Sequence, residues 1–398
     1  MGAAASVGVA GLAGCAAPSG ADSAAPLAPT PLDGAASAQF RGGLQRWGLQ
    51  DVPVPADVTV DWTLEAVNTG THTAAKASPV SAPTGDVIIA GDTGTVRAVH
   101  PDGSVRWTAE TEPTTRGIHG TPAIANGTVY VGAYDGAVYA FDLRTGDRMW
   151  RSKLGDAIGS SPAYYNGLLY IAVEYATPSG RVYALDAADG KPVWVDRRPT
   201  DHPHSSIAID REAGRLVVGA NDGNCYAWTF PGLEREWVFE TGGPIKGPIA
   251  TVDGLAIVGS WDEHVYALDL ATGDEVWSFR ADGDVMAAPA IDPTGVVYVG
   301  SHDWRVYALD LATGEERWRF ATDGMVIGGL VVTPGHVLVG SYDATLYALD
   351  KAEGTETWAV TSNGHVTSAP LVRDDGIYYT ERAAPTEPGH AYKLVPAG

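Results

Sequence analysis

Short apolar runs separated by turn-forming residues recur along this chain. A well-formed copy begins with Ile257-Val258-Gly259-Ser260, continues with Val265-Tyr266-Ala267-Leu268-Asp269, and reaches Trp277 through Leu270-Ala271-Thr272-Gly273. Runs rich in Val, Ile and Tyr that are bounded by Gly, Asp, Asn and Thr are typical of β-strands joined by tight turns. No helical period competes with this pattern. The sequence therefore predicts an all-β protein.

The runs belong to a repeat whose period is marked by tryptophan. Eight tryptophans are separated by 45, 43, 44, 43, 40, 41 and 40 residues: Trp62, Trp107, Trp150, Trp194, Trp237, Trp277, Trp318 and Trp358. A further segment recurs before the first apolar run, as in Gly120-Thr121-Pro122-Ala123-Ile124, and together with the strand that carries Trp it predicts four strands per repeat. Four-stranded units of this length are the blades of a β-propeller.

The two ends of the chain complete one repeat between them. Residues 377–379 and 391–394 repeat the two middle strands of a blade, but the chain ends before the corresponding tryptophan. Trp62, near the other end, stands in a strand-like segment with no blade core before it. We expect this strand to join the C-terminal strands in one composite blade. The predicted fold is an eight-bladed β-propeller of four-stranded antiparallel blades, closed by its N- and C-terminal strands.

The repeat resembles that of a known family. The eleven-residue pattern from Ala267 to Trp277, with Thr-Gly in its middle, resembles the tryptophan-docking motif of quinoprotein-like (PQQ-like) propellers. Further copies stand at residues 140–150, 184–194, 308–318 and 348–358, and the resemblance covers about 330 of the 398 residues. The segment from Phe40 to Arg46 is similar to the sequence that leads into blade one in such proteins. The resemblance implies that the eight periodic tryptophans dock between neighbouring blades and are structural.

Charge limits the class of partner. The chain has 48 acidic and 26 basic residues, a formal net charge of −22, and six of the basic residues are lysine. Such a surface repels polyanions, so no nucleic-acid partner is expected. The acidic excess with arginine favoured over lysine resembles proteins of halophilic microbes, in which salt screens the self-repulsion. An ordinary acidic secreted protein is the alternative, and the dependence of stability on salt distinguishes the two.

The start of the chain suggests export. Residues 1–15 end in Leu12-Ala13-Gly14-Cys15, which resembles a lipoprotein processing box and predicts a lipid anchor at Cys15. Residues 1–11 contain no Lys or Arg, whereas a signal peptide begins with a cationic region. We therefore expect a partial signal sequence with basic residues encoded further upstream. An unmodified Cys15 is the alternative.

Three segments follow the processing box. Residues 16–38 are dominated by Ala, Pro, Ser and Gly and are predicted to form a disordered tether. Residues 39–56 are predicted to be a lead-in segment, and residues 57–398 the PQQ-like propeller. The expected protein is extracytoplasmic and monomeric, and it touches the membrane through the lipid anchor alone.

The motifs for cofactor, metal or nucleophilic chemistry are missing from the sequence. Cys225 occupies the strand position of Val265 and Val306 in sister repeats, which predicts a buried apolar thiol. Quinone-dependent alcohol dehydrogenases of this superfold carry a vicinal cysteine pair and a calcium site of Glu, Asn and Asp, and this chain has no Cys-Cys pair. His202 and His204 are the one close histidine pair and are interpreted as part of a solvated loop. No cofactor, metal or catalytic residue is therefore expected.

The varied turns of the repeats lie on one face of the predicted ring. The turns between the third and fourth strands are nearly identical copies of Asp-Leu-Ala-Thr-Gly, whereas the turns between the second and third strands, and the loops between blades, differ from copy to copy. The latter two sets share one face. An Asp that recurs there, from Asp135 to Asp343, is predicted to cap the turn. Candidate binding residues on this variable face are Arg116, His119, Tyr134, Tyr175, Trp261, His302, Trp304 and Tyr342.

Two tryptophans make this face the candidate recognition surface. Trp261 and Trp304 are additional to the periodic set and fall in adjacent blades. Trp, Tyr and Arg dominate the energetics of protein interfaces, although packing on the rim of their own blades is the alternative role for both. Trp47 and Trp228 also lie outside the period and are further candidates.

Two functions from different classes remain. The favoured one is a non-catalytic, lipid-anchored extracytoplasmic scaffold that holds a protein or peptide partner at the loop face. It resembles the propeller lipoproteins of the outer-membrane β-barrel assembly machinery in repeat type, blade number and anchor. The alternative is a PQQ-dependent dehydrogenase, with calcium, or a degenerate relative that binds a small ligand in the channel.

Overall fold

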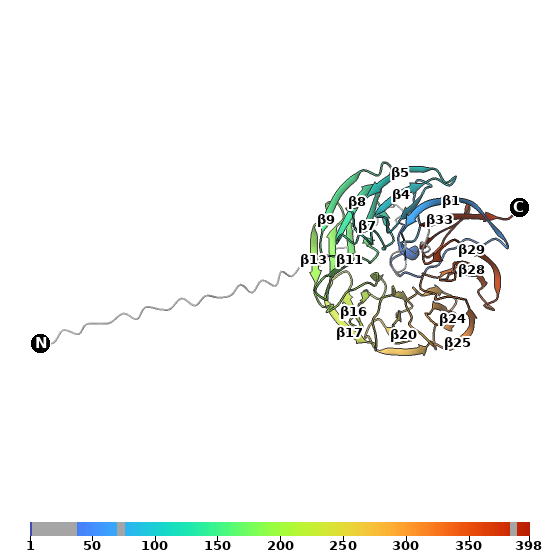
Figure 1. Ribbon diagram of the computed structural model, residues 1–398. Helices are drawn as coiled ribbons and strands as arrows, with labels where there is room; N and C mark the ends of the chain where they lie inside the picture. The colour runs from blue at the N-terminus through green and yellow to red at the C-terminus, as the bar shows by residue number, and fades with distance from the viewer. Residues whose placement is uncertain (2–37, 70–75, 383–387) are drawn as a thin grey trace.

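The chain folds into eight sheets arranged around a central axis. The computed structural model describes residue 1 and residues 38–69, 76–382 and 388–398. Figure 1 shows the sheets as the blades of a closed ring, with the first and last strands, β1 and β33, side by side. The predicted eight-bladed propeller is therefore confirmed. The predicted lipid anchor at Cys15 lies outside the described residues, as does the predicted tether at 16–38 except for Ala38, which forms a β-bridge with Ile124.

Seven blades are four-stranded antiparallel sheets made of consecutive strands. Blade one comprises β2 (Val80–Ser81), β3 (Val87–Ala90), β4 (Thr95–Val99) and β5 (Val105–Glu110). Blade two comprises β6 (Ala123–Ala125), β7 (Thr128–Gly132), β8 (Ala137–Asp142) and β9 (Arg148–Lys153). Blade three comprises β10 (Ala163–Tyr165), β11 (Leu168–Tyr175), β12 (Ser179–Asp186) and β13 (Pro192–Asp196). Blades four and five comprise β14 (Ala208–Asp210), β15 (Arg215–Gly219), β16 (Asn224–Thr229) and β17 (Arg235–Glu240); and β18 (Ala250–Val252), β19 (Leu255–Gly259), β20 (His264–Asp269) and β21 (Glu275–Arg280). Blades six and seven comprise β22 (Ala290–Asp292), β23 (Val296–Gly300), β24 (Arg305–Asp310) and β25 (Glu316–Ala321); and β26 (Val331–Val332), β27 (His336–Gly340), β28 (Thr345–Asp350) and β29 (Glu356–Thr361).

The eighth blade joins the two ends of the chain. Its C-terminal part comprises β30 (His365–Val366), β31 (Leu371–Arg373), β32 (Gly376–Arg382) and β33 (Gly389–Pro396), and its outer strand is β1 (Val58–Asn68). β1 pairs antiparallel with β33, in a register that places Thr63 opposite Tyr392. The composite blade predicted from the two incomplete repeats is therefore present, and strand pairing closes the ring.

The innermost strands are shorter than the recurring segment that predicted them. In blade two the strand begins at Ala123, after Thr121-Pro122, and in blade three it begins at Ala163, after Pro162. Because proline has no N–H to donate to a ladder, it stands before the strand rather than within it. The residues before each innermost strand therefore line the axis of the ring.

The periodic tryptophans bridge neighbouring blades. Trp107 donates its indole N–H to the carbonyl of Leu143 at 2.9 Å, and Trp277 does the same to Leu311 at 2.9 Å. The glycine of each receiving turn has a positive φ, and a Cβ on Gly146 or Gly314 would lie within 3 Å of the indole. Equivalent N–H bonds are made by Trp62, Trp150, Trp237, Trp318 and Trp358. The repeated Thr-Gly turn is therefore the surface on which the previous blade's indole rests.

Blade four departs from this arrangement. Its turn after β16 reads Phe230-Pro231-Gly232, and Trp194 packs edge-on against Trp228, with ring centroids 6.0 Å apart. Trp228 is fully buried and donates its N–H to Asp196 Oδ2 at 3.0 Å. The expectation that Trp228 is available for binding is wrong, because it fills the interior beside Trp194.

Residues 38–52, here called the plug segment, cross the ring at its axis. Carbonyls of the segment accept N–H groups from the innermost strands of blades two, four, five, six and seven: Ile124 bonds Ala38 O, Ile209 bonds Leu44 O, Thr251 bonds Gln45 O, Ile291 bonds Trp47 O and Val332 bonds Gly48 O. Trp47 also donates its side-chain N–H to Thr251 O at 2.5 Å. Trp47 is therefore part of the scaffold, and the plug segment links blades that are far apart in sequence.

Two buried arginines hold the plug segment. Arg46 donates to the carbonyls of Ile207 at 3.0 Å and Phe40 at 2.9 Å, and Arg41, at the centre of the short 3₁₀ helix η1 (Phe40–Gly42), donates to Leu330 O at 2.7 Å and to Pro289 O. Burial lowers the pKa of Arg46 to about 9, so the guanidinium remains charged at neutral pH. Its charge is stabilised by carbonyl dipoles rather than by a carboxylate.

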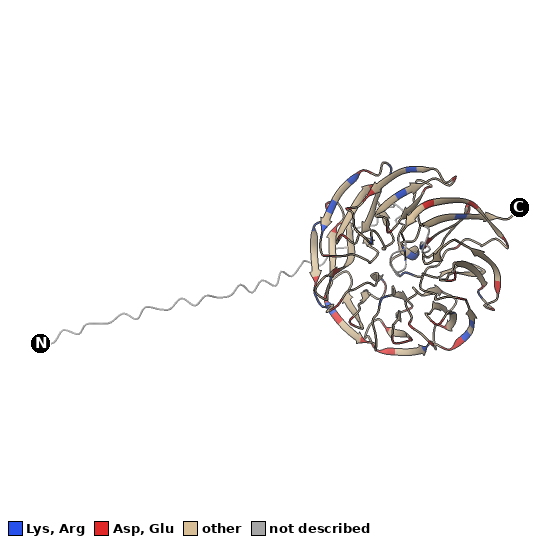
Figure 2. Cartoon of the chain, viewed as in Figure 1, with Lys and Arg blue, Asp and Glu red and all other residues tan. Residues whose placement is uncertain are grey.

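Charged side chains are concentrated toward the outside of the ring. Figure 2 shows acidic and basic positions along the outer strands, with few charges on the strands nearer the axis. Cys225 is buried opposite Gly219, as its sister Val265 is opposite Gly259, so the predicted apolar thiol is confirmed. Within the described ranges, no helix has the length and apolar character needed to cross a membrane.

Candidate binding site at the channel mouth

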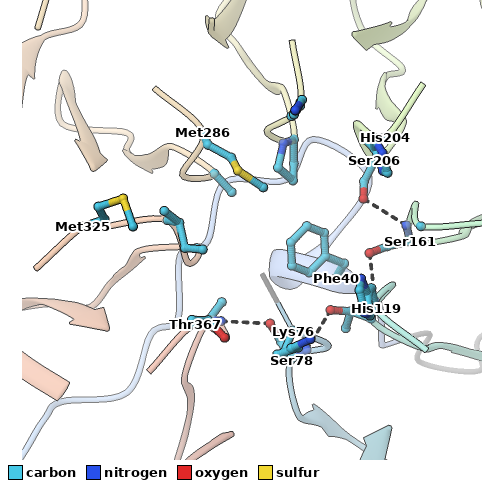
Figure 3. Close-up of a pocket in the computed structure, with 18 of the residues that line it drawn as sticks. Phe40, Lys76, Ser78, His119, Ser161, His204, Ser206, Met286, Met325 and Thr367 are labelled. Carbon is cyan, nitrogen blue, oxygen red and sulfur yellow. Dashed lines mark hydrogen bonds between the residues drawn. The ribbon is translucent and has the colours of Figure 1, made fainter. Parts of the chain in front are cut away.

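A cavity of about 420 Å³ occupies the axis of the ring on the variable face. Its walls come from the residues before the innermost strands and from the turns and interblade loops of that face. Figure 3 shows Phe40 of η1 in the middle of the channel, where the plug segment forms the floor. The charged residues among the described lining are Lys76, Arg116 and Lys246, all of them basic. A site without lining carboxylates is unexpected in a protein with a net charge of −22.

A chain of hydroxyl groups forms one side of the cavity. The backbone N–H of Ser78 donates to Thr121 Oγ1, that of Thr121 to Ser161 Oγ, and that of Ser161 to Ser206 Oγ, each at 2.9 Å. Ala369 N–H completes the series by donating to Ser78 Oγ at 2.9 Å. Each bond joins one blade to the next, as Figure 3 shows for the labelled residues. The polar side is thus a rigid wall whose backbone donors are satisfied by side chains.

The opposite side is apolar. Met286, Ala288, Met325 and Ile327 line it, and Figure 3 places the two methionines across the channel from the serines. Methionine is flexible and polarisable, so it accommodates ligands of differing shape. The cavity therefore offers a fixed polar wall and an adaptable apolar wall to the same occupant.

Three side chains form a compact donor cluster at the mouth. Lys246 Nζ lies 3.3 Å from the centroid of the Trp261 ring, and the rings of Trp261 and His302 are 5.7 Å apart. Trp261 Nε1 and His302 Nε2 are both buried without a hydrogen-bond partner among the described residues, although both side chains line the cavity. Buried polar atoms are normally paired. The Lys246–Trp261–His302 cluster therefore places an ammonium beside two rings that line the cavity and whose buried nitrogens have no partner among the described residues.

Neighbouring carboxylates affect the orientation and the pKa of side chains in this cluster. His302 Nδ1 lies 3.4 Å from Asp284 Oδ2, which orients the imidazole. Burial lowers the pKa of His302, and Asp284 opposes that effect, so the imidazole is neutral at neutral pH. Burial likewise lowers the pKa of Lys246, against the attraction of Asp284 and Asp201. The Lys246 ammonium is thus partly desolvated, which strengthens its attraction for an anionic group.

Basic residues also lie on the side of blades one and two. Arg116 lies 5.5 Å above the Tyr134 ring, which is itself 4.5 Å from the ring of His119. Lys76 forms a fully buried ion pair with Asp92 at 2.9 Å. Positive groups therefore face the cavity from both sides.

The structure brings together most of the residues predicted to bind. Arg116, His119, Tyr134, Trp261, His302 and Tyr342 all line the one cavity. Tyr175 lies further out and donates to Leu154 O at 2.7 Å, while Trp304 is 53% exposed at the turn of blade six and is not part of the lining. The recurring Asp caps its turn as predicted, for example by accepting the N–H of Thr345 at Asp343 Oδ1, 2.9 Å away. Asp343 Oδ2 also accepts a hydrogen bond from the hydroxyl of Tyr347.

Sequence reasoning missed several residues of the mouth. Lys76 and Lys246 are isolated lysines with no motif around them, and Ser78, Ser161 and Ser206 stand in no motif for binding or catalysis. The recurrence of Ser or Thr before proline in blades one to three was the available signal. Glu174 was also missed, although it lies beside the His202–His204 pair.

The repeats match an established family. The family model described as outer membrane protein assembly factor BamB matches residues 55–196, 134–260, 179–324 and 302–386, which together span nearly all of the propeller. The chain belongs to this family. BamB from Bordetella pertussis is 31% identical over 186 residues, which is 44% of this chain and 45% of that protein.

The BamB repeat is also similar to that of oxidoreductases. The quinohemoprotein alcohol dehydrogenase from Comamonas testosteroni is 27% identical over 198 residues, 44% of this chain and 27% of that protein. The crystal structure of the same dehydrogenase covers 90% of this chain and 80% of its own, with a TM-score of 0.74 and 16% sequence identity. The chain thus spans about half or less of the length of the curated relatives it matches, and the structural likeness shows the fold alone.

Proposed function

We propose that this protein is a non-catalytic extracytoplasmic scaffold, anchored through Cys15, that holds a carboxylate-bearing segment of a protein partner in the channel mouth. The observation that carries the proposal is the Lys246–Trp261–His302 cluster, in which a cation and two rings with buried, unpartnered nitrogens line one cavity. The family supports the partner class, because its described members are assembly factors for outer membrane proteins.

The cavity suits a peptide segment in both chemistry and shape. A carboxylate accepts charge-assisted hydrogen bonds from Lys246 and from the Trp261 N–H, while Nε2 of neutral His302 is an acceptor for a donor such as a backbone N–H of the same segment. Met286 and Met325 on the opposite wall contact an apolar side chain of the same segment. The acidic exterior repels acidic segments elsewhere, so binding is directed to the mouth.

Fluorescence anisotropy with two labelled peptides tests the proposal. One peptide is rich in Glu and contains one Tyr, and its control carries Lys at each Glu position. We expect the acidic peptide to bind the wild-type protein and to lose at least about tenfold in affinity with Lys246→Ala or Trp261→Ala, since one such residue is worth more than about 1.4 kcal/mol at an interface.

Trp304→Ala is the matched control, because this tryptophan lies on the same face outside the cavity lining. Equal binding of the two peptides, or an equal loss of affinity with Trp304→Ala, would contradict the proposal. Crosslinking in native membranes at high salt, with the Trp261→Ala and Trp304→Ala variants compared, then identifies the partner.

A second candidate is a PQQ-dependent dehydrogenase or a degenerate relative. It is favoured by the size of the cavity and by its basic lining, which suits an anionic planar molecule. The calcium of such enzymes requires oxygen ligands, whereas the described residues that line the cavity include no Asp, Glu or Asn. The donor set present therefore does not fit a calcium-assisted quinone site.

Reconstitution separates the two candidates. The protein is mixed with PQQ and calcium, and dye reduction is followed with alcohols and aldoses as substrates. Turnover, or PQQ binding tighter than micromolar together with failure of the acidic peptide to bind, would favour the dehydrogenase over the scaffold.

A further inference from the structure

Three potential metal ligands meet between blades three and four. Glu174 is the next-to-last residue of β11, and His202 and His204 belong to the loop from β13 to β14. One ligand atom from each residue lies within 4.8 Å of the other two, and no other such group of His, Cys, Asp or Glu occurs among the described residues. We propose that Glu174, His202 and His204 bind a divalent transition-metal ion such as Zn²⁺ at the edge of the channel.

The position of Glu174 is fixed by its backbone. Its N–H donates to Ala157 O at 2.9 Å, and its carbonyl accepts the N–H of Asp156 at 2.9 Å. These bonds tie β11 to the loop from the neighbouring blade, while the ladder with Gly180 holds the other edge. The Glu174 side chain is 5% exposed and His204 lines the cavity. The carboxylate is thus presented from a rigid strand rather than from a loop.

Two glycines leave room for the three ligands to meet. A Cβ on Gly159 would lie 3.0 Å from Glu174 Oε1 and 3.0 Å from His204 Nδ1, and its φ is outside the left-handed region, so glycine is needed there for space. A Cβ on Gly180 would lie 2.4 Å from Cδ of Pro203, between the two histidines. A larger residue at either position would push the histidine loop away from Glu174.

The nitrogen and oxygen atoms have the protonation pattern that a metal requires. His202 Nε2 lies 2.8 Å from the carbonyl of Tyr175. Because a carbonyl only accepts, Nε2 carries the proton and Nδ1 keeps a lone pair, which is the usual arrangement for a metal-binding histidine. His204 Nδ1 lies 3.0 Å from Glu174 Oε1. A metal ion would replace the proton between these two atoms.

Two imidazoles and one carboxylate select the class of metal. This donor set suits zinc and other first-row divalent ions, whereas calcium and magnesium prefer oxygen alone. Metal–ligand distances of about 2.0–2.2 Å require donors about 3–3.5 Å apart, so the widest pair must approach by about 1 Å. The His202 and His204 side chains are 30% and 27% exposed, which leaves them free to make this adjustment. Three protein ligands leave a coordination position open for water or an anionic ligand.

Calorimetric titration of the metal-stripped protein with ZnCl₂ tests the proposal, and Co²⁺ absorption reports the coordination. We expect one ion per chain, with at least about tenfold weaker binding for His202→Ala, His204→Ala and Glu174→Gln. His264→Ala is the matched control: its imidazole is 31% exposed and lies 3.5 Å from Asp262 Oδ1, but it has no third ligand. Far-UV circular dichroism without metal verifies that each variant is folded.

Three outcomes would overturn the proposal. They are wild-type protein that takes up no zinc, histidine variants that bind zinc as the wild type does, and calcium binding at least as tight as zinc binding. The titration uses no partner, so a negative result leaves the scaffold function standing. Failure of the acidic peptide to bind would likewise leave the metal site intact.

Discussion

At the scale of single residues, the same amino acid has different roles according to its place in the repeat. Trp277 bridges two blades through its N–H bond to Leu311, Trp228 is buried against Trp194, and Trp261 faces the cavity with its N–H unpartnered. The regular spacing of the repeat distinguishes docking tryptophans such as Trp277 from the other two, because a docking tryptophan occupies the same position in every blade. Separating Trp228 from Trp261 requires the packing around each side chain.

Truncating a docking tryptophan should reduce stability strongly. In Trp277→Ala the indole's packing and its bond to Leu311 are lost, and we expect a decrease of about 3–5 kcal/mol in the free energy of unfolding. Urea denaturation followed by circular dichroism measures the change. Val276→Ala is the control, because the neighbouring side chain is 51% exposed. Similar losses for both variants would contradict a docking role for Trp277.

His302 should make stability depend on pH. Burial lowers its pKa in the native state below the ordinary value of 6.5, so the unfolded chain binds this proton more readily. The stabilisation from neutral His302 is complete above pH 6.5 and is lost as pH falls from 6.5 through the lower native pKa. We expect Tm to fall less in His302→Gln than in the wild type between about pH 7.5 and about pH 5. Parallel slopes for the two proteins would show that His302 does not contribute.

At the scale of elements, the blades form by local pairing, whereas the plug segment is held largely by contacts with blades that are distant in sequence. Arg41 reaches carbonyls of blades six and seven, and Arg46 bonds a carbonyl of blade four and one within the segment itself. The position of the plug segment therefore depends on blades that the chain adds much later.

Replacing Arg46 should release the plug segment. Arg46→Ala leaves the buried carbonyls of Ile207 and Phe40 without donors, and we expect a loss of about 2–3 kcal/mol or more. Arg46→Lys keeps the charge but not the planar fork, so it should recover only part of the loss. Native-state hydrogen exchange of residues 38–52 measures the release. Unchanged protection of these amides in Arg46→Ala would contradict the role of this side chain.

Sequence patterns predicted the structural elements that recur in every blade but not the features that occur only once, such as the plug segment. Four strands per blade, the docking turns and the composite blade follow from patterns that recur, and the structure confirms the resulting ring. The plug segment has no second copy and few regular strands, so nothing in its sequence shows that it crosses the axis. Glu174 and His204 are 30 residues apart in the chain and on different elements, and they meet only because an interblade loop folds back over β11.

At the scale of the whole molecule, ring closure depends on β1. Deleting residues 57–66 removes most of the strand that pairs with β33, although it removes no complete repeat. We expect a lower Tm and self-association through the exposed edge of β33, measured by calorimetry and size-exclusion chromatography. Val60→Ala, at a 45% exposed position of β1, is the control. A monomeric deletion variant with wild-type Tm would show that the ring closes without this strand.

The net charge should make stability depend on salt. With 48 acidic and 26 basic residues, repulsion between surface carboxylates opposes folding at low ionic strength. We expect Tm to rise as KCl increases from millimolar to molar concentration, because screening shortens the range of this repulsion. A flat or falling Tm would exclude a halophilic adaptation. Differential scanning calorimetry across the series measures it.

The floor that Phe40 and the plug segment form limits how an occupant can enter and leave the cavity. Because Phe40 and the plug segment stand on the axis, a polypeptide could pass along the channel only by displacing them. If the proposed function holds, a partner would therefore enter and leave by the same mouth, presenting a chain end or a loop, and we expect one bound segment per propeller.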